Sequence, residues 1–117
     1  MQHLLDLFKQ IQEERIPIIV EGKNDVKALK ELGFEFFYTL RKPIYKIMEE
    51  LHKQNIKQII ILTDFDVKGK ELYKKIKSEC SQRGIRIFTK LRSELRKTDV
   101  VHIEGLDTYI TNFLKKS

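Results

Sequence analysis

The chain has 117 residues, of which 41% are hydrophobic and 34% are charged, a composition typical of one globular domain with a single core. It has no apolar run near the ~20 residues of a membrane span and its first residues lack the features of a signal peptide, so we expect a cytoplasmic protein without membrane partners. The single cysteine excludes an internal disulfide framework and a multi-cysteine zinc site. The net charge of +6 favours a polyanionic partner such as nucleic acid but does not establish one.

Helical and strand patterns alternate from the start of the chain. Apolar residues at the helical spacing i, i+3, i+4, i+7 come first, at Leu4, Leu7, Phe8 and Ile11. Residues 17–20 are predicted to form a buried strand. Asn24 is placed to cap the next helix, which Gly33 closes. Residues 34–40 are predicted to form a short strand, and Pro43 suits the first turn of the helix after it.

The second half of the chain continues this alternation. Residues 58–63 are predicted to form the central strand, and the helix after it carries an apolar face of Leu72, Tyr73, Ile76 and Cys80. Gly84 ends this helix, residues 85–89 form a further strand, and Ser93 is placed to cap a short helical turn. Residues 100–103 are compatible with a last strand. A terminal helical stripe follows, at Leu106, Tyr109, Ile110, Phe113 and Leu114.

Strands that alternate with helices imply right-handed crossovers and a mainly parallel sheet covered on both faces. We therefore predict an α/β fold of three layers, with a central sheet of about four strands and helices on both faces. Residues 1–117 show no repeat, low-complexity segment or long linker, so we expect one domain.

Two aspartates directly follow the most apolar run, in the stretch "LTDFD" at residues 62–66. Ligands of open α/β sheets bind at the carboxyl ends of strands. Two interpretations fit: Asp64 and Asp66 form a turn and a helix cap, or they hold a metal ion. Alternation along the chain puts both on one side and Phe65 on the other. Glu21, which follows the first predicted strand, is a poor turn former and a poor cap, and so favours the metal.

If the first and central strands are neighbours, Glu21, Asp64 and Asp66 meet within a few ångströms. Three carboxylates cannot all stay ionised there without a counter-charge. Mg²⁺ or Mn²⁺ supplies one, because both bind carboxylates, water and substrate phosphate. We therefore predict a Mg²⁺ (or Mn²⁺) site. Asp25 is either a further ligand or a residue that interacts with the helix dipole.

Basic side chains share the predicted carboxyl edge of the sheet. Each one alone is typical of a solvated surface, and only their clustering suggests contact with nucleic-acid phosphates. The candidates are Lys23, Lys68, Lys90 and Arg92. Gly22 and Gly69 fit both a close backbone approach to a ligand and ordinary turns.

The remaining polar residues do not predict further chemistry. No Ser, Cys or Tyr lies beside a residue that would activate it, so we predict no nucleophile. Glu104 is a loop carboxylate, or faces the same edge if residues 100–103 form a strand. The histidines have no ligand spacing and are expected at surface or interface positions: His3, His52 and His102.

The stretches "IIVEGKNDVKAL" and "IIILTDFDVKGKEL" resemble the Toprim domain, which is shared by topoisomerases, bacterial primases, overcoming-lysogenization-defect nucleases and the ribonuclease that matures 5S ribosomal RNA. A strand-end glutamate before glycine, then a D-x-D with a downstream glycine, marks that family. Glu21-Gly22 and Asp64-x-Asp66-x-x-Gly69 match this pattern in order.

The resemblance covers roughly residues 15–106. Asp25 matches an acid of primase-like members, and residues 91–106 are similar to the small stand-alone Toprim proteins of archaea and some bacteria. The resemblance implies a Toprim (Rossmann-like) fold in which Glu21 is a general acid or base and the two aspartates of the D-x-D hold Mg²⁺.

The chain also departs from the family pattern. Topoisomerases bring a nucleophilic tyrosine from another domain, and nuclease relatives add nucleic-acid-binding domains, neither of which is seen here. Primase-like members have further acids where this chain has Thr89-Lys90-Leu91. The metal site is therefore implied more firmly than any activity.

Three functions stay open. The first is a metal-dependent enzyme of nucleic-acid phosphodiesters, nuclease-like or a phosphotransferase, in RNA processing or DNA replication. The second is a non-catalytic, Mg²⁺-dependent module that binds nucleic acid or a protein partner. The third, a receiver-like signalling domain, is disfavoured because Glu21 gives one acid where a receiver needs two. The two amphipathic terminal helices either pack on the chain's own sheet or contact a partner or a second copy.

Overall fold

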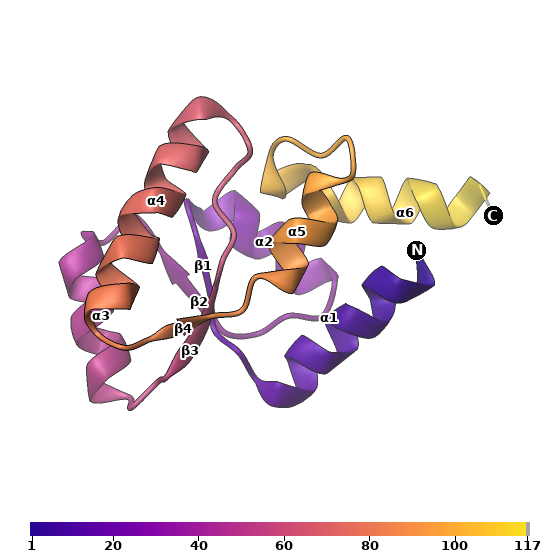
Figure 1. Cartoon of the computed structure of the whole chain (residues 1–117). Coiled ribbons are helices and arrows are strands. Elements are labelled where there is room, and N and C mark those ends of the chain that lie inside the picture. The colour runs from indigo at the N-terminus through magenta and orange to yellow at the C-terminus, as the bar shows by residue number, and fades with distance from the viewer. Residues whose placement is uncertain (117) are drawn as a thin grey trace.

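Four short strands form a parallel sheet in the computed structural model, which describes residues 1–116 (Figure 1). They are β1 (Ile18–Val20), β2 (Phe37–Thr39), β3 (Gln58–Ile61) and β4 (Arg86–Ile87). The order β2-β1-β3-β4 makes β1 and β3 the central pair. Ile18 is paired with both Phe37 and Ile60, so three strands run in register through the middle of the sheet.

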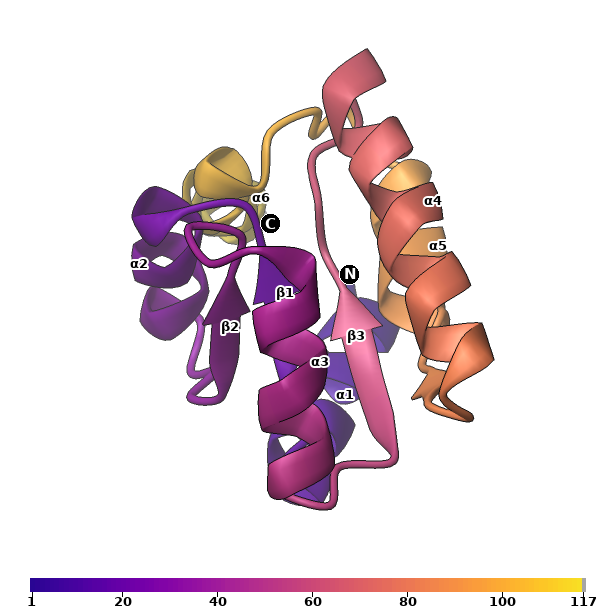
Figure 2. The ribbon, with the colours of Figure 1, turned by 90° about the vertical axis from the view of Figure 1, so that its left-hand side faces the viewer.

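Helices cover both faces of this sheet. They are α1 (Gln2–Glu14), α2 (Lys23–Glu31), α3 (Ile44–Lys53), α4 (Val67–Gln82), α5 (Lys90–Arg96), a 3₁₀ turn η1 (Ile103–Gly105) and α6 (Leu106–Lys116). Because side chains alternate along a strand, Ile18 and Val20 pack with residues of α1, α2, α5 and α6. Ile19 and Ile61 pack with residues of α3 and α4 on the other face, and Figure 2 shows α3 lying across β1 and β3. The predicted three-layer α/β fold is confirmed.

One predicted strand is wrong. Residues 100–103 form no strand; they run as irregular backbone into η1. One backbone bond joins this segment to the loop after β3: the amide of Phe65 donates to the carbonyl oxygen of Val101 at 2.7 Å. The amide of Ile103 donates instead to a side chain, the carboxylate of Asp64, at 2.8 Å. A side-chain oxygen thus replaces the backbone carbonyl that strand pairing requires, and residues 100–103 do not pair further with the sheet.

Two predicted caps are also wrong. The residue that precedes α2 is Gly22, because the Asp25 carboxylate accepts the Gly22 amide at 2.9 Å and starts the helix earlier than Asn24. The residue that precedes α5 is Thr89, and Ser93 lies inside that helix.

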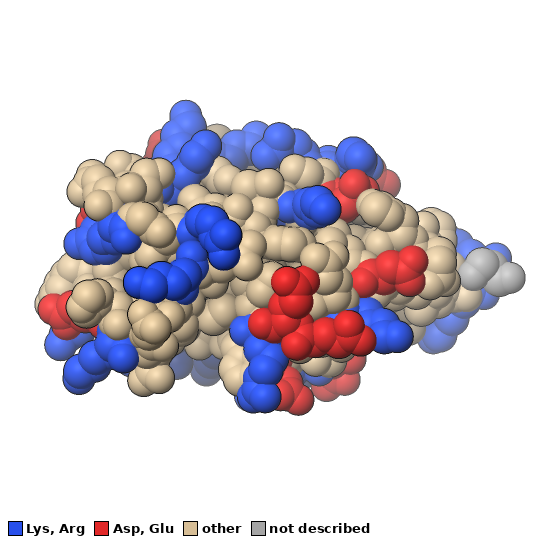
Figure 3. Space-filling model, turned by 60° about the horizontal axis from the view of Figure 1, so that its bottom comes forward, with Lys and Arg blue, Asp and Glu red and all other residues tan. Residues whose placement is uncertain are grey.

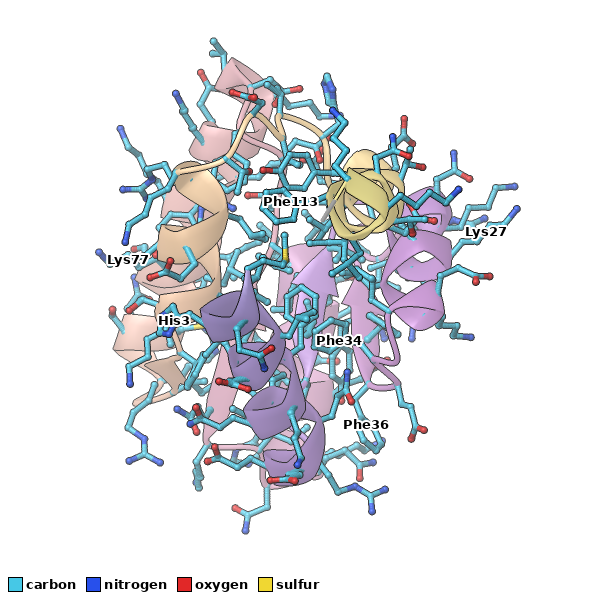
Figure 4. All side chains as sticks on the ribbon, turned by 90° about the vertical axis from the view of Figure 1, so that its right-hand side faces the viewer. His3, Lys27, Phe34, Phe36, Lys77 and Phe113 are labelled. Atoms are coloured by element: carbon cyan, nitrogen blue, oxygen red, sulfur yellow. The ribbon has the colours of Figure 1, made fainter. Side chains whose placement is uncertain are left out.

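The two terminal helices differ in how completely their apolar faces pack on the chain's own core. All four residues of the α1 stripe are buried, and Phe8 meets Phe34 edge to face at 5.1 Å, where Figure 4 shows Phe34 beside α1. α1 therefore packs on the chain's own core. In α6, Ile110 is buried whereas Phe113 is 43% exposed. Among the described residues, no helix is both long and apolar enough to span a bilayer.

Candidate metal centre

The carboxyl ends of β1 and β3 lie side by side, as the prediction required. β1 is followed by Glu21, and β3 is followed, after two buried residues, by Asp64. An oxygen of the Glu21 carboxylate, Oε2, accepts the amide of Asp64 at 2.7 Å. This hydrogen bond joins the two motifs of the sequence directly.

Asp66 is the helix cap that one interpretation predicted, but the cap uses only one of its oxygens. Its Oδ1 accepts the amide of Gly69 at 2.7 Å at the start of α4. The hydroxyl of Thr63 donates to the carbonyl of Gly69 at 2.6 Å and closes the loop from the other side. A β-carbon at Gly69 would overlap the backbone of Asp64. The loop is therefore tight, and Oδ2 of Asp66 is turned away from these backbone contacts.

Asp64 and Asp66 meet a histidine that the sequence did not single out. His102 Nε2 lies 3.5 Å from Asp66 Oδ2. One carboxylate oxygen from each aspartate and one ring nitrogen of His102 all lie within 4.8 Å of one another. Phe65 points away, with its ring against the core, as the alternation predicted. No spacing pattern marks His102, because long-range backbone contacts bring it here.

Two further acids border this triad. Glu21 lies outside the triad and contacts Asp64 through the backbone. Asp25 is only 6% exposed, and burial raises its pKa above the usual value; the Gly22 amide opposes that rise, and the negative charges of Asp64, Glu21 and Glu104 add to it. These charges show that the loop acid Glu104 belongs to the same acidic neighbourhood.

Arg92 does not lie on the exposed rim where we expected a phosphate contact. It is 4% exposed, and its guanidinium donates to the carbonyl oxygens of Thr63 at 2.6 Å and Asp64 at 3.3 Å. The rings of Phe65 and Tyr73 enclose it, with their centroids 4.5 Å and 4.6 Å away. Its place is underneath the loop that carries the aspartates.

The predicted lysines are divided between two places. Lys23 and Lys68 are exposed in the first turns of α2 and α4, the helices that begin at the acidic edge. Lys90 is exposed beside α1, where it lines a cavity of about 290 Å³ together with His3 and Asp6. Figure 3, a view from the opposite end of the sheet, shows further Lys and Arg side chains there. Basic charge is therefore spread over the molecule.

The donor set fits a divalent cation. Oδ1 of Asp64 and Oδ1 of Asp66 each accept one backbone amide, and a carboxylate oxygen can accept a hydrogen bond while its partner oxygen binds a metal. Two ligands of one ion at about 2.1 Å lie at most about 4.2 Å apart, and the three donor atoms of the triad lie within 4.8 Å of one another. The triad can therefore hold Mg²⁺ or Mn²⁺ once its side chains close on the ion.

Comparison with known proteins identifies the relatives of this chain. Residues 16–95 match the family model of the Toprim domain. A UPF0292 protein of Methanocaldococcus jannaschii is 40% identical and spans 97% of this chain and 94% of that protein. A UPF0292 protein of Thermococcus gammatolerans is 32% identical, over 97% and 86% of the two chains. A solved structure described as a putative protein from Aquifex aeolicus matches with a TM-score of 0.80 and 27% identity, over 90% of this chain and 96% of that one.

Proposed function

This chain belongs to the Toprim domain family, as its two motifs predicted, and we propose that it is a metal-dependent protein that acts on the phosphodiesters of nucleic acid in the manner of a nuclease. The family implies a metal-binding, nucleic-acid-related role in general. The observation that carries the narrower proposal is the junction of Glu21 with Asp64 at 2.7 Å beside two aspartates at coordination spacing.

Asp64 and Asp66 would hold Mg²⁺ or Mn²⁺ at the mouth of the sheet. Such an ion stabilises charge on a phosphate and lowers the pKa of a bound water. The amide of Gly69 holds the Asp66 carboxylate and the amide of Ile103 holds the Asp64 carboxylate before any ligand arrives, so binding requires little reordering of the backbone.

Glu21 is the proposed general acid or base. Its Oε2 is anchored by the Asp64 amide, which aims the carboxylate at the acidic edge. In residues 1–116 its second oxygen has no hydrogen bond to protein. That oxygen is free to take a proton from an attacking water or to give one to the leaving oxygen. Lys23 and Lys68, exposed on either side, would contact the phosphates that flank the reacting one.

A second candidate is a non-catalytic module that uses Mg²⁺ to hold nucleic acid or a partner. The observation in its favour is that Glu21 and Asp25 both accept backbone amides, from Asp64 and Gly22. Carboxylates used in this way stabilise the loops of the site even where no bond is broken.

The deciding experiment measures cleavage of labelled structured RNA and DNA with Mg²⁺ or Mn²⁺. In Glu21→Gln the amide oxygen still accepts the Asp64 amide hydrogen, so the variant loses the proton-transfer group but keeps the loop. Glu35→Gln, an exposed carboxylate between α2 and β2, is the matched control. Cleavage that is lost only in Glu21→Gln supports the enzyme. Binding without cleavage supports the module, and the absence of both contradicts both candidates.

A second measurement tests the metal itself. Asp64→Asn still accepts the Ile103 amide through its side-chain oxygen but removes one charge from the acidic cluster. We expect the melting temperature of the metal-free variant to equal or exceed that of the wild type, with a weaker metal affinity. A wild type that gains no thermal stability from millimolar Mg²⁺ or Mn²⁺ would contradict the metal site, because binding to the folded state must stabilise it.

A further inference from the structure

His102 lies between two backbone anchors that bind the same loop. On one side, the carbonyl of Val101 accepts the amide of Phe65 at 2.7 Å. On the other side, the amide of Ile103 donates to Oδ1 of Asp64 at 2.8 Å. The residue between these anchors is thus held beside the D-x-D loop by backbone contacts that involve no part of its own side chain. These contacts fix the backbone of His102 beside the loop, and its side chain reaches Asp66 from there.

The ring nitrogen also has ligand geometry. His102 Nε2 lies 3.5 Å from Oδ2 of Asp66, and the three donor atoms lie within 4.8 Å of one another. Neighbouring ligands of a six-coordinate ion, each about 2.1 Å from the metal, are about 3 Å apart. The distance from His102 Nε2 to Asp66 Oδ2 exceeds this by about half an ångström, and the three donor atoms lie within 4.8 Å of one another, so an ion would draw the side chains together.

A surface ion pair between His102 and Asp66 is the simpler alternative. Both side chains are substantially exposed, at 57% and 40%, and exposed pairs contribute little to stability. An ion pair needs one carboxylate, whereas the imidazole here faces oxygens of two. In addition, the backbone on both sides of His102 is hydrogen-bonded to the loop that carries the aspartates. A surface ion pair does not need such contacts.

We propose that His102 is a third protein ligand of the metal held by Asp64 and Asp66, and that its nitrogen makes the site prefer Mn²⁺ to Mg²⁺. This inference rests on the proposed metal-dependent function. Mg²⁺ strongly favours oxygen ligands, whereas imidazole suits transition metals. Mn²⁺ and Mg²⁺ share a preference for octahedral oxygen-rich sites. Replacing one oxygen ligand by nitrogen therefore lowers the affinity for Mg²⁺ more than the affinity for Mn²⁺.

The test compares the dissociation constants of Mn²⁺ and Mg²⁺ in untagged protein by calorimetry. In His102→Gln we expect Mn²⁺ affinity to fall about tenfold and Mg²⁺ affinity to change much less. His102→Asp offers an oxygen ligand instead, and should bring the ratio of the two affinities toward Mg²⁺. His52→Gln, at the last turn of α3 and exposed, is the matched control and should leave both affinities unchanged.

A spectroscopic measurement on wild-type protein decides the question without relying on a variant. Pulsed electron paramagnetic resonance of the Mn²⁺-loaded protein should show coupling to one ¹⁴N nucleus, which His102→Gln should abolish and His52→Gln should retain. Bound Mn²⁺ without nitrogen coupling, or an unchanged affinity ratio in His102→Gln, would overturn the role of His102 and leave the proposed function standing. Failure of the wild type to bind either ion would overturn the proposed function as well.

Discussion

The guanidinium of Arg92 donates a hydrogen bond to the carbonyl oxygen of Thr63, with 2.6 Å between the two atoms. A second bond, of 3.3 Å, reaches the carbonyl of Asp64, and the guanidinium lies over the rings of Phe65 and Tyr73. A buried cation of α5 thus fixes the backbone that presents the aspartates. Its positive charge also lies directly beneath the acidic cluster.

Removing this cation should weaken both the fold and the metal site. Arg92→Met keeps an unbranched apolar chain between the two rings but leaves two carbonyls without a donor, so we expect the free energy of unfolding to fall by about 2–3 kcal/mol. Mn²⁺ affinity should fall as well, because the loop loses its support. Urea unfolding and calorimetry measure the two effects. Arg96→Met, at an exposed position of the same helix, is the control; equal stability of the two variants would contradict a supporting role for Arg92.

Gly69 should be intolerant of any side chain. A β-carbon there would overlap the backbone of Asp64, which cannot rotate away as a side chain would. We expect Gly69→Ala to lower the free energy of unfolding by about 1–3 kcal/mol and to weaken metal binding, because the loop must open. Gly105→Ala, whose β-carbon would meet no atom within 4 Å, is the matched control. A Gly69→Ala variant with wild-type metal affinity would show that the loop geometry is not needed.

Asp25 should make the protein less stable when it is ionised. Burial raises its pKa above the usual 3.8, with a further rise from Asp64, Glu21 and Glu104, while the Gly22 amide opposes it. The folded protein therefore holds this proton more tightly than the unfolded chain, and stability is lost as the pH rises through the folded-state pKa.

Asp25→Asn removes that charge and still accepts the Gly22 amide. At pH 7 and without metal, we expect its melting temperature to exceed that of the wild type by on the order of 2–5 °C, with the difference shrinking toward pH 4. Melting curves across this range measure it. A variant that is less stable than the wild type at pH 7 would mean that the carboxylate charge stabilises the loop.

Cys80 should be inert in the folded protein. It is fully buried, and burial raises the pKa of its thiol to about 11, although Arg83 partly opposes the rise. An aromatic disulfide reagent at pH 8 should react only as fast as the protein unfolds.

The same shift makes the free energy of unfolding depend on pH. The unfolded thiol ionises from about pH 9 and the folded one does not, so Cys80 lowers the free energy of unfolding as the pH rises from 9 toward 11. Cys80→Ala should lose less stability over that interval, and prompt labelling of native protein would contradict the burial.

The two strand-end motifs could be predicted because each is local. Glu21 directly follows one short buried strand and Asp64 follows another after two further residues, and the parallel sheet required by the alternating pattern brings those ends together. The helix faces could be predicted for the same reason: all four residues of the α1 stripe are buried. These features depend on spacing within one element, which a sequence shows directly.

His102 and the role of Arg92 could not be predicted, because both depend on contacts between distant parts of the chain. His102 reaches the aspartates through backbone bonds made by Val101 and Ile103. Arg92 looks like any surface cation in the sequence, and only the rings of Phe65 and Tyr73 reveal its burial. The same long-range bonds explain why residues 100–103 do not continue the sheet.

The last prediction concerns the exposed lysines at the acidic edge. If Lys23 and Lys68 contact phosphates, each Lys→Gln substitution should lower the slope of log affinity against log salt concentration by roughly one unit. Lys9 on α1 and Lys115 on α6 are exposed at positions predicted to be far from the strand ends, and their substitution should leave the slope nearly unchanged. The measurement is a salt titration of binding to labelled RNA and DNA with Mn²⁺ present. Because Lys and Arg side chains are also scattered, among Asp and Glu, over the face shown in Figure 3, equal effects from both pairs would indicate diffuse attraction to the whole surface. Nucleic acid would then have no defined path to the metal.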